Sequence, residues 1–70
     1  MVVEQRLSEY IRERGIRQAF ICERAGIDET LFSRSLAGKR DMKLDEFERV
    51  CRALKTDPNE FVKPANNTTE

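Results

Sequence analysis

The sequence QAFICERAGIDETLFSRSLA, at residues 18–37, decides the fold of this chain. Apolar side chains stand on both sides of Gly26, with Ile21 and Cys22 before it and Phe32 after it, and most other positions are polar and short. Two short helices joined by a tight turn that contains glycine have this pattern, and the second helix turns a polar face to solvent. The stretch therefore predicts a helix-turn-helix.

Upstream of this stretch, residues 3–14 predict a first helix with one apolar face. Its apolar side chains recur at helical spacing: Val3, Leu7, Tyr10 and Ile11. Gly15 is a natural C-terminal end for it. Arg17 then stands at the N-cap of a second helix over residues 18–24, although arginine has no acceptor with which to cap a helix. The Arg17 side chain is either simply solvated or a cation that faces an anionic partner.

A third helix is predicted over residues 28–36, with Asp28 as a good N-cap. Helical spacing turns Phe32 and Ser35 inward. The side chains turned outward are Glu29, Thr30 and Arg34. This outward face is the candidate surface for recognising a partner molecule.

Two more helices are predicted downstream. Residues 39–43 form a basic loop anchored by Met42, and residues 44–54 have the clearest amphipathic pattern in the chain. The inward positions of that fourth helix are Leu44, Phe47, Val50, Cys51 and Leu54. Asp57 and Pro58 supply the N-cap and the first position of a short fifth helix.

The predicted fold class is all-α, because no segment alternates apolar and polar residues as a strand does. We expect one compact five-helix domain over residues 1–62 and a flexible C-terminal tail over residues 63–70, where apolar content is low. A chain of 70 residues, of which 37% are charged, fits a single small globule with little room for a catalytic cleft.

Several function classes are excluded by residues that the sequence lacks. It has no histidine, no glycine-rich phosphate loop and no nucleophile–base pair, so an enzyme is not expected. Cys22 and Cys51 lack CxxC spacing and are interpreted as reduced packing residues, so no metal site or disulfide is expected. No cofactor and no small-molecule ligand are expected either. Without a bilayer-spanning apolar run or a signal sequence, the expected location is the cytoplasm.

The charge balance at first argues against a nucleic-acid partner, because the formal net charge is zero. The charges are unevenly distributed, however. Residues 1–40 carry eight of the 13 Arg and Lys side chains but six of the 13 acids. The basic excess therefore lies in the same half of the chain as the predicted helix-turn-helix.

The outward face of the third helix carries side chains that suit the edges of DNA bases. Arg34 can donate paired hydrogen bonds to guanine, Thr30 can bond a base or touch a thymine methyl, and Glu29 can accept from cytosine. Glu29 is repelled by phosphates, so it reads a base, pairs with Arg34 or rejects wrong sequences. The flanking side chains predicted to hold phosphates are Arg17, Gln18, Lys39, Arg40 and Lys43.

From about residue 3 to residue 62, the chain resembles the phage-repressor family of helix-turn-helix domains, the Cro and lambda-repressor-like or XRE group. The residues that carry the resemblance are Gln18, Ile21, Cys22, Ala25, Gly26, Ile27, Phe32, Ser33, Arg34, Gly38, Lys39, Arg40, the apolar side of the fourth helix, and residues 57–61. The resemblance implies a five-helix lambda-repressor-like domain in a bacterial or phage transcriptional regulator, which binds double-stranded DNA as a homodimer on a two-fold operator.

The chain departs from this family's usual pattern at several positions. Ser35 stands where a larger apolar residue is common, which predicts looser packing of the third helix. Ile11 and Leu36 replace an arginine and a glutamate that pair in many members, and an aliphatic contact can substitute for that pair. Phe20 occupies a position that is usually polar, so it either folds back on residues 1–3 or belongs to a partner surface.

A homodimer is expected because two domains related by a two-fold axis reach major-groove faces about 34 Å apart. Phe61 and Val62 in the fifth helix are the predicted dimer interface. The function hypothesis is a sequence-specific DNA-binding regulator, most simply a repressor, with the helix at residues 28–36 in the major groove. The alternative is a protein–protein interaction module that retains the helix-turn-helix core without DNA binding.

Overall fold

The structure, a computed structural model, describes residues 2–62, and these form five α-helices. The helices are α1 (Val2–Arg14), α2 (Gln18–Ala25), α3 (Glu29–Leu36), α4 (Leu44–Leu54) and α5 (Asn59–Val62). No strand occurs in this part of the chain, so the all-α prediction is confirmed. The predicted tail at residues 63–70 lies outside the described residues and stays a prediction.

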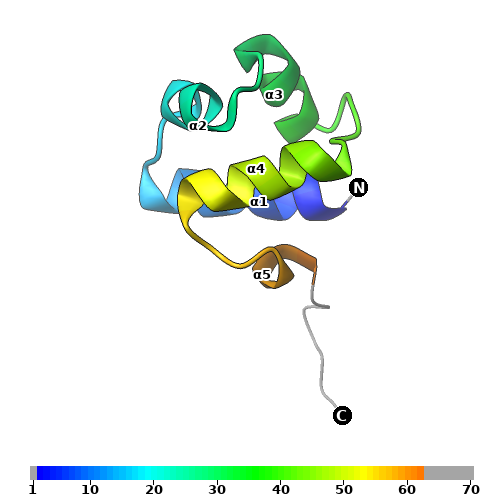
Figure 1. Cartoon of the computed structure of the whole chain (residues 1–70). Helices are drawn as coiled ribbons and strands as arrows, with labels where there is room; N and C mark the ends of the chain where they lie inside the picture. Colours follow the sequence, from blue (N-terminus) through cyan, green and yellow to red (C-terminus); the bar gives the residue numbers. More distant parts are fainter. Residues whose placement is uncertain (1, 63–70) are drawn as a thin grey trace.

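The helices surround one apolar core. Figure 1 shows α2 and α3 on one side of the molecule and α5 on the other, with α1 and α4 between them. The buried apolar side chains are Leu7, Ile11, Ile21, Cys22, Ala25, Phe32, Met42, Phe47, Val50, Cys51 and Phe61. Every described helix contributes to this set, so α2 and α3 are held as one body on the α1–α4 support.

The turn between α2 and α3 forms as the sequence predicts. Gly26 has φ 71°, a left-handed conformation that costs glycine little because it has no Cβ. Its N–H and that of Ile27 both donate to the carbonyl oxygen of Cys22, at 2.8 and 3.1 Å. Asp28 then caps α3, its Oδ1 accepting from the N–H groups of Thr30 and Leu31 at 2.8 and 3.1 Å. Backbone groups at the C-terminal end of α2 and at the N-terminal end of α3 thus find hydrogen-bond partners within a few residues of each other.

The fourth helix has the predicted bounds, but one of its predicted core residues is on the surface. Leu44 is 72% exposed, because it occupies the first position of α4 and projects beyond the core that Phe47, Val50 and Cys51 enter. The prediction that Leu44 faces inward is therefore wrong. Helical periodicity identified the face correctly but gave no information on where along that face the core ends.

The fifth helix attaches to the molecule through Phe61. This ring meets Tyr10 of α1 and Phe47 of α4 edge-on, at centroid distances of 5.2 and 6.1 Å, and only 3% of the residue is exposed. Phe61 is thus a core residue of this chain, and the dimer interface predicted at Phe61 and Val62 stays a prediction. Val62, also predicted there, is half exposed.

Both cysteines are buried and free, as expected for packing residues. Burial raises the pKa of the Cys51 thiol to about 11, with smaller contributions from Asp57 and Glu48, and raises that of Cys22 as well. Neither thiol therefore ionises readily near neutral pH. None of the helices in residues 2–62 is long and apolar enough to cross a membrane.

Candidate nucleic-acid interface

The outer face of α3 is polar and accessible along its whole length. Glu29, Thr30 and Arg34 are exposed, while Phe32 and Ser35 on the opposite face are fully buried. The buried pair anchors the helix to α1 and α2, and the exposed side chains project away from the core. The structure therefore places the three predicted base-reading side chains together on the outer surface of one helix.

A shallow hollow of about 330 Å³ lies between this face and the beginning of α2. Its lining residues are Gln18, Glu29, Thr30, Ser33 and Arg34. The hollow brings Gln18, predicted to bind a phosphate, to the three predicted base readers. Ser33 is an additional hydroxyl that the sequence interpretation did not select.

The N-terminal end of α2 next to this hollow has no side-chain cap. Arg17 occupies the N-cap position with extended backbone and makes no capping hydrogen bond. The first N–H groups of a helix need partners from outside the helix, and their partial positive charge attracts anions. Arg17 adds a full positive charge at the same end, and its side chain is exposed.

The loop between α3 and α4 contains two exposed cations and one that is engaged within the fold. Lys39 and Lys43 are exposed. Arg40, also predicted to bind phosphate, donates from Nη1 to Ser35 Oγ and from Nη2 to Glu46 Oε2, both at 2.9 Å. The guanidinium thus ties α3 to α4, and Arg40 differs in role from its neighbour Lys39.

Glu46 holds the end of this loop from inside α4. Its Oε1 accepts from the Lys43 N–H at 3.0 Å while Oε2 pairs with Arg40. The hydrogen bond from Arg40 lowers the pKa of Glu46, burial opposes the shift, and the Lys43 N–H lowers it further. The carboxylate is therefore the stable form in the fold, and it fixes the backbone that carries Lys43.

Glu4 of α1 holds the same loop at Met42. The Met42 N–H donates to Glu4 Oε2 at 2.7 Å, and only 2% of Glu4 is exposed. Burial alone would raise the pKa of this carboxyl, but backbone N–H donors, with Met42 foremost, bring it below its ordinary value. Two buried carboxylates from different helices thus position the loop between α3 and α4.

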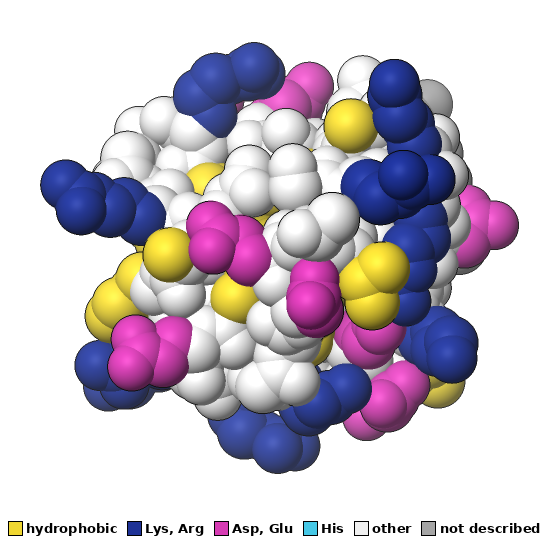
Figure 2. All heavy atoms as spheres, turned by 90° about the horizontal axis from the view of Figure 1, so that it is seen from above, with side chains coloured by type: hydrophobic (Ala, Val, Ile, Leu, Met, Phe, Trp, Pro, Cys, Tyr) yellow, Lys and Arg dark blue, Asp and Glu magenta, His cyan; other side chains and the backbone are white. Residues whose placement is uncertain are grey.

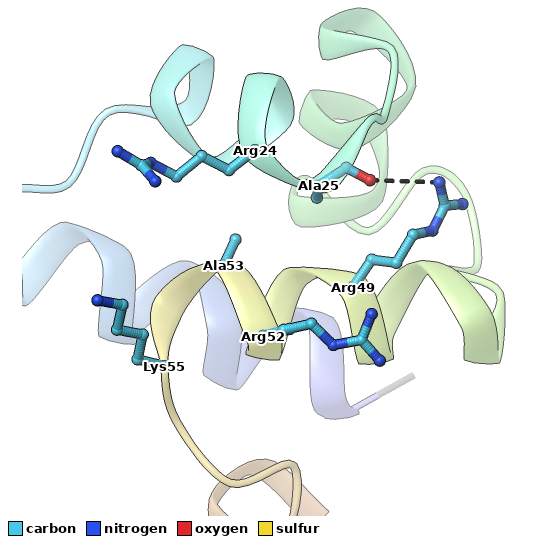
Figure 3. Close-up of a pocket in the computed structure, with 6 residues that line it drawn as sticks. All are labelled: Arg24, Ala25, Arg49, Arg52, Ala53 and Lys55. Atoms are coloured by element: carbon cyan, nitrogen blue, oxygen red, sulfur yellow. Dashed lines mark hydrogen bonds between the residues drawn. The ribbon is translucent and has the colours of Figure 1, made fainter.

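Arg49 supports the turn of the helix-turn-helix from α4. Its Nη1 donates to the carbonyl oxygen of Ala25 at 3.2 Å (Figure 3) and to that of Gly26 at 3.3 Å. Its Nη2 pairs with Asp45 at 3.1 Å. The last carbonyls of a helix lack partners within the helix. Arg49 supplies one, so α4 satisfies the end of α2 directly.

Charge is mixed on the surface that α2 and α3 expose. Figure 2, which looks down on these helices, shows acidic side chains near the centre and Lys and Arg side chains toward the edges, with a dense column of them along the right. Exposed apolar side chains lie among them, including Phe20 and Leu31. Phe20 carries the Arg24 guanidinium 4.5 Å from its ring centre. The predicted contact of Phe20 with residues 1–3 stays a prediction, since the side chains of residues 1 and 2 lie outside the described part.

The sequence interpretation missed the residues that position this surface, namely Glu4, Ser35 as a hydrogen-bond partner, Glu46 and Arg49. A glutamate at the third position of α4 is a capping signal, so Glu46 was accessible to sequence reasoning. Glu4 and Arg49 have no such signal, because their partners are 38 and 24 residues away in the chain. Ser35 was expected to loosen packing, and in the structure it accepts a hydrogen bond instead.

Comparison with known families gives one match. The model of the Cro/C1-type HTH DNA-binding domain matches residues 6–65, which is most of the chain. The chain belongs to this family. No curated protein and no solved structure matches it significantly.

Membership in the Cro/C1-type family makes the chain a DNA-binding helix-turn-helix domain of the kind that regulates transcription. This is a family of DNA-binding proteins and not of enzymes. It explains why α3 presents a polar face that the core does not use. The exposed α2–α3 surface is the surface that this kind of domain offers to DNA.

Proposed function

We propose that this Cro/C1-type protein is a cytoplasmic repressor that binds a two-fold operator as a homodimer, with α3 in the major groove. The observation that carries the proposal is the hollow between α2 and α3, where Gln18 meets the exposed side chains of α3. A helix about 10–12 Å wide fits the major groove, and its exposed donors and acceptors then face base edges.

Three side chains of α3 are assigned to base reading. Arg34 donates to guanine, Thr30 contacts an adjacent base, and Glu29 either accepts from cytosine or rejects operators that place phosphate nearby. The loss of Arg34 should relax base preference, because a bidentate arginine contact is worth about 1–3 kcal/mol of discrimination.

The phosphate contacts flank this reading face on two sides. Arg17 and Gln18 belong to the open end of α2, and Lys39 and Lys43 belong to the loop between α3 and α4. Arg40 is engaged with Glu46, so its proposed part in phosphate binding is to hold this loop in place and add its charge to it.

The homodimer is proposed through the α5 end of the molecule. Val62 is half exposed there, next to a helix that Phe61 anchors firmly in the core. Sedimentation of Val62→Glu should show a monomer if this surface forms the dimer. Leu44→Glu, at an exposed leucine on α4, is the matched control and should leave the oligomeric state unchanged. A dimeric Val62→Glu protein would move the interface elsewhere.

Selection of bound duplexes from a random pool tests the function directly. A pair of inverted half-sites whose centres are about 10 base pairs or one further helical turn apart would support a dimer on a two-fold operator. Arg34→Ala should then bind with relaxed preference at one position of each half-site. Arg12→Ala, an exposed arginine of α1, is the control and should retain the wild-type preference.

The salt dependence of binding distinguishes the proposal from the rival role of a protein-interaction module. Phosphate contacts release counterions, so the logarithm of the affinity should fall linearly with that of the salt concentration, by about 0.9 for each contact. Lys39→Ala and Lys43→Ala should each reduce that slope by about one. If no duplex binds even at low salt, the exposed Phe20 and Leu31 would instead favour the interaction module.

A further inference from the structure

A second hollow, of about 280 Å³, lies at the C-terminal end of α2, against α4. We call it the basic slot, and its lining residues are Arg24, Ala25, Arg49, Arg52, Ala53 and Lys55. Figure 3 shows Ala53 pointing from α4 toward α2, with Arg24 and Lys55 on one side of it and Arg49 and Arg52 on the other. The slot thus has a floor of methyl groups and a cationic rim on both sides.

Most of this positive charge is not neutralised by the fold. The side chains of Arg52 and Lys55 make no hydrogen bond or ion pair with any described residue, and the Arg24 guanidinium lies over the Phe20 ring. Among these four cations, only Arg49 has an acidic partner within residues 2–62, namely Asp45 on the outer side of α4. Four cations therefore surround one hollow in a chain whose formal net charge is zero.

Helix ends explain only part of this arrangement. Cations near the last turn of a helix interact favourably with its macrodipole. At α2 that role belongs to Arg49, which bonds the carbonyls of Ala25 and Gly26. At the end of α4, the N–H of Lys55 donates to backbone carbonyls, while the side chains of Arg52 and Lys55 are exposed. These exposed charges repel one another unless an anion lies between them.

We propose that the basic slot binds an acidic segment of a partner protein, with carboxylates on both rims and a small apolar side chain on the alanine floor. Carboxylates on an extended chain can project to either side of the backbone, as the two rims require. Arginine guanidinium groups pair with carboxylates in a bidentate geometry. The floor contributes by excluding water from these pairs.

A peptide fits the slot better than a second stretch of DNA backbone does. Backbone N–H groups at a helix start are common phosphate ligands, but α2 directs carbonyl oxygens toward this site. The slot also lies at the opposite end of α2 from Gln18 and from the hollow that Gln18 shares with the exposed side chains of α3. An eight-residue helix is about 12 Å long, and this length separates the slot from the beginning of α2.

The test is a titration of the ¹⁵N-labelled full chain with a synthetic peptide in which pairs of glutamates alternate with single alanines. The expected result is saturable movement of the amide signals of Arg24, Ala25 and Ala53. The proposal stands apart from the DNA-binding role, because this titration uses the free protein. Absence of saturable shifts at these positions would overturn it.

Two matched charge reversals show where the peptide binds. Arg52→Glu with Lys55→Glu alters the slot, and Lys39→Glu with Lys43→Glu alters the DNA side by the same net charge, all four positions being exposed. The slot variant should lose about tenfold or more in peptide affinity and keep its affinity for the selected duplex within about twofold. The DNA-side variant should show the reverse.

Two other outcomes contradict the proposal. If the slot variant loses duplex affinity and keeps peptide affinity, the slot is a contact for DNA phosphate. If both variants lose peptide affinity equally, the peptide responds to general charge and has no defined site. Amide spectra of each variant, recorded before titration, establish that the fold is intact in both comparisons.

Discussion

At its N-terminal end, α2 has Arg17 at the N-cap position and no side-chain cap. At its C-terminal end, by contrast, several backbone carbonyl groups accept hydrogen bonds. There, Gly26 and Ile27 donate to the Cys22 carbonyl, and Arg49 bonds the last carbonyls from α4. The uncapped N-terminal end, the open end, adjoins the hollow that Gln18 and the exposed side chains of α3 line. The C-terminal end, the closed end, adjoins α4. The difference shows how one short helix is both held by the core and left with free donors for an anion.

The same contrast recurs between two consecutive residues of the loop after α3. Lys39 is exposed, while Arg40 is bound to Ser35 and Glu46. One cation is available to a partner and the next holds the loop in place. A basic residue near the interface is therefore assigned a role only after its hydrogen bonds are known.

Removal of the Glu46 carboxylate, which holds the loop between α3 and α4, should have the largest effect on stability. Glu46→Ala deletes the ion pair with Arg40 and the acceptor of the Lys43 N–H. We expect a loss of about 2–3 kcal/mol in the free energy of unfolding, because a part-buried guanidinium and a backbone donor lose their partner. Urea denaturation measures it. Glu48→Ala, at an exposed position of the same helix, is the control and should change stability by no more than about 0.5 kcal/mol.

Closing the open end of α2 should separate stability from DNA binding. Arg17→Asp supplies the missing N-cap, so we expect a gain of about 1 kcal/mol in stability. The same change places a carboxylate beside the proposed phosphate site, so duplex affinity should fall about tenfold. Thermal unfolding and fluorescence anisotropy measure the two quantities. A variant that gains stability and binds DNA as well as the wild type would show that this end of α2 does not meet a phosphate.

Straining the closed end should have a moderate effect. Gly26→Ala forces a side chain into the left-handed region at φ 71°, at a cost of about 1 kcal/mol. Gly15→Ala, at φ 66° after α1, is a matched control for strain alone. Both variants should lose similar stability, and only Gly26→Ala should also weaken duplex binding at a temperature where both are folded. Equal binding by the two variants would mean that the angle between α2 and α3 tolerates this strain.

The smallest expected effect is the pH dependence of the free energy of unfolding that each buried carboxylate contributes. Glu4 and Glu46 have pKa values below their ordinary 4.5 in the fold, so the unfolded chain takes up protons first as the pH falls. Their contribution is complete above about pH 4.5 and is lost below it, with a slope of at most about 1.4 kcal/mol per pH unit for each carboxylate. Urea titrations across this range should show a shallower slope for Glu46→Gln. An unchanged slope would exclude Glu46 as a source of the effect.

Local patterns predicted most of the fold. Gly26, Asp28 and the apolar spacing of residues 44–54 indicated a turn, a cap and a helix that the structure confirms. These signals succeed because they depend on interactions within a few residues of one another. Leu44 departs from the pattern because the extent of the core depends on which elements cover α4.

The exposed side chains of the candidate site were predictable from the sequence, whereas the contacts that hold them in place were not. Spacing alone placed Glu29, Thr30 and Arg34 on the outer face of α3. It could not separate the free Lys39 from the engaged Arg40, or place Phe61 in the core, because each outcome depends on a partner in another helix.

The sequence by itself determined the five helices, the glycine turn and the polar face of α3, since backbone geometry and side-chain periodicity act over one or two helical turns. The tertiary structure decided which charges are bound and which are free. Glu4 meets Met42, and Arg49 meets Ala25, across 38 and 24 residues of chain. Such pairs form only after the core brings the helices together, because no local pattern encodes the partner of a long side chain.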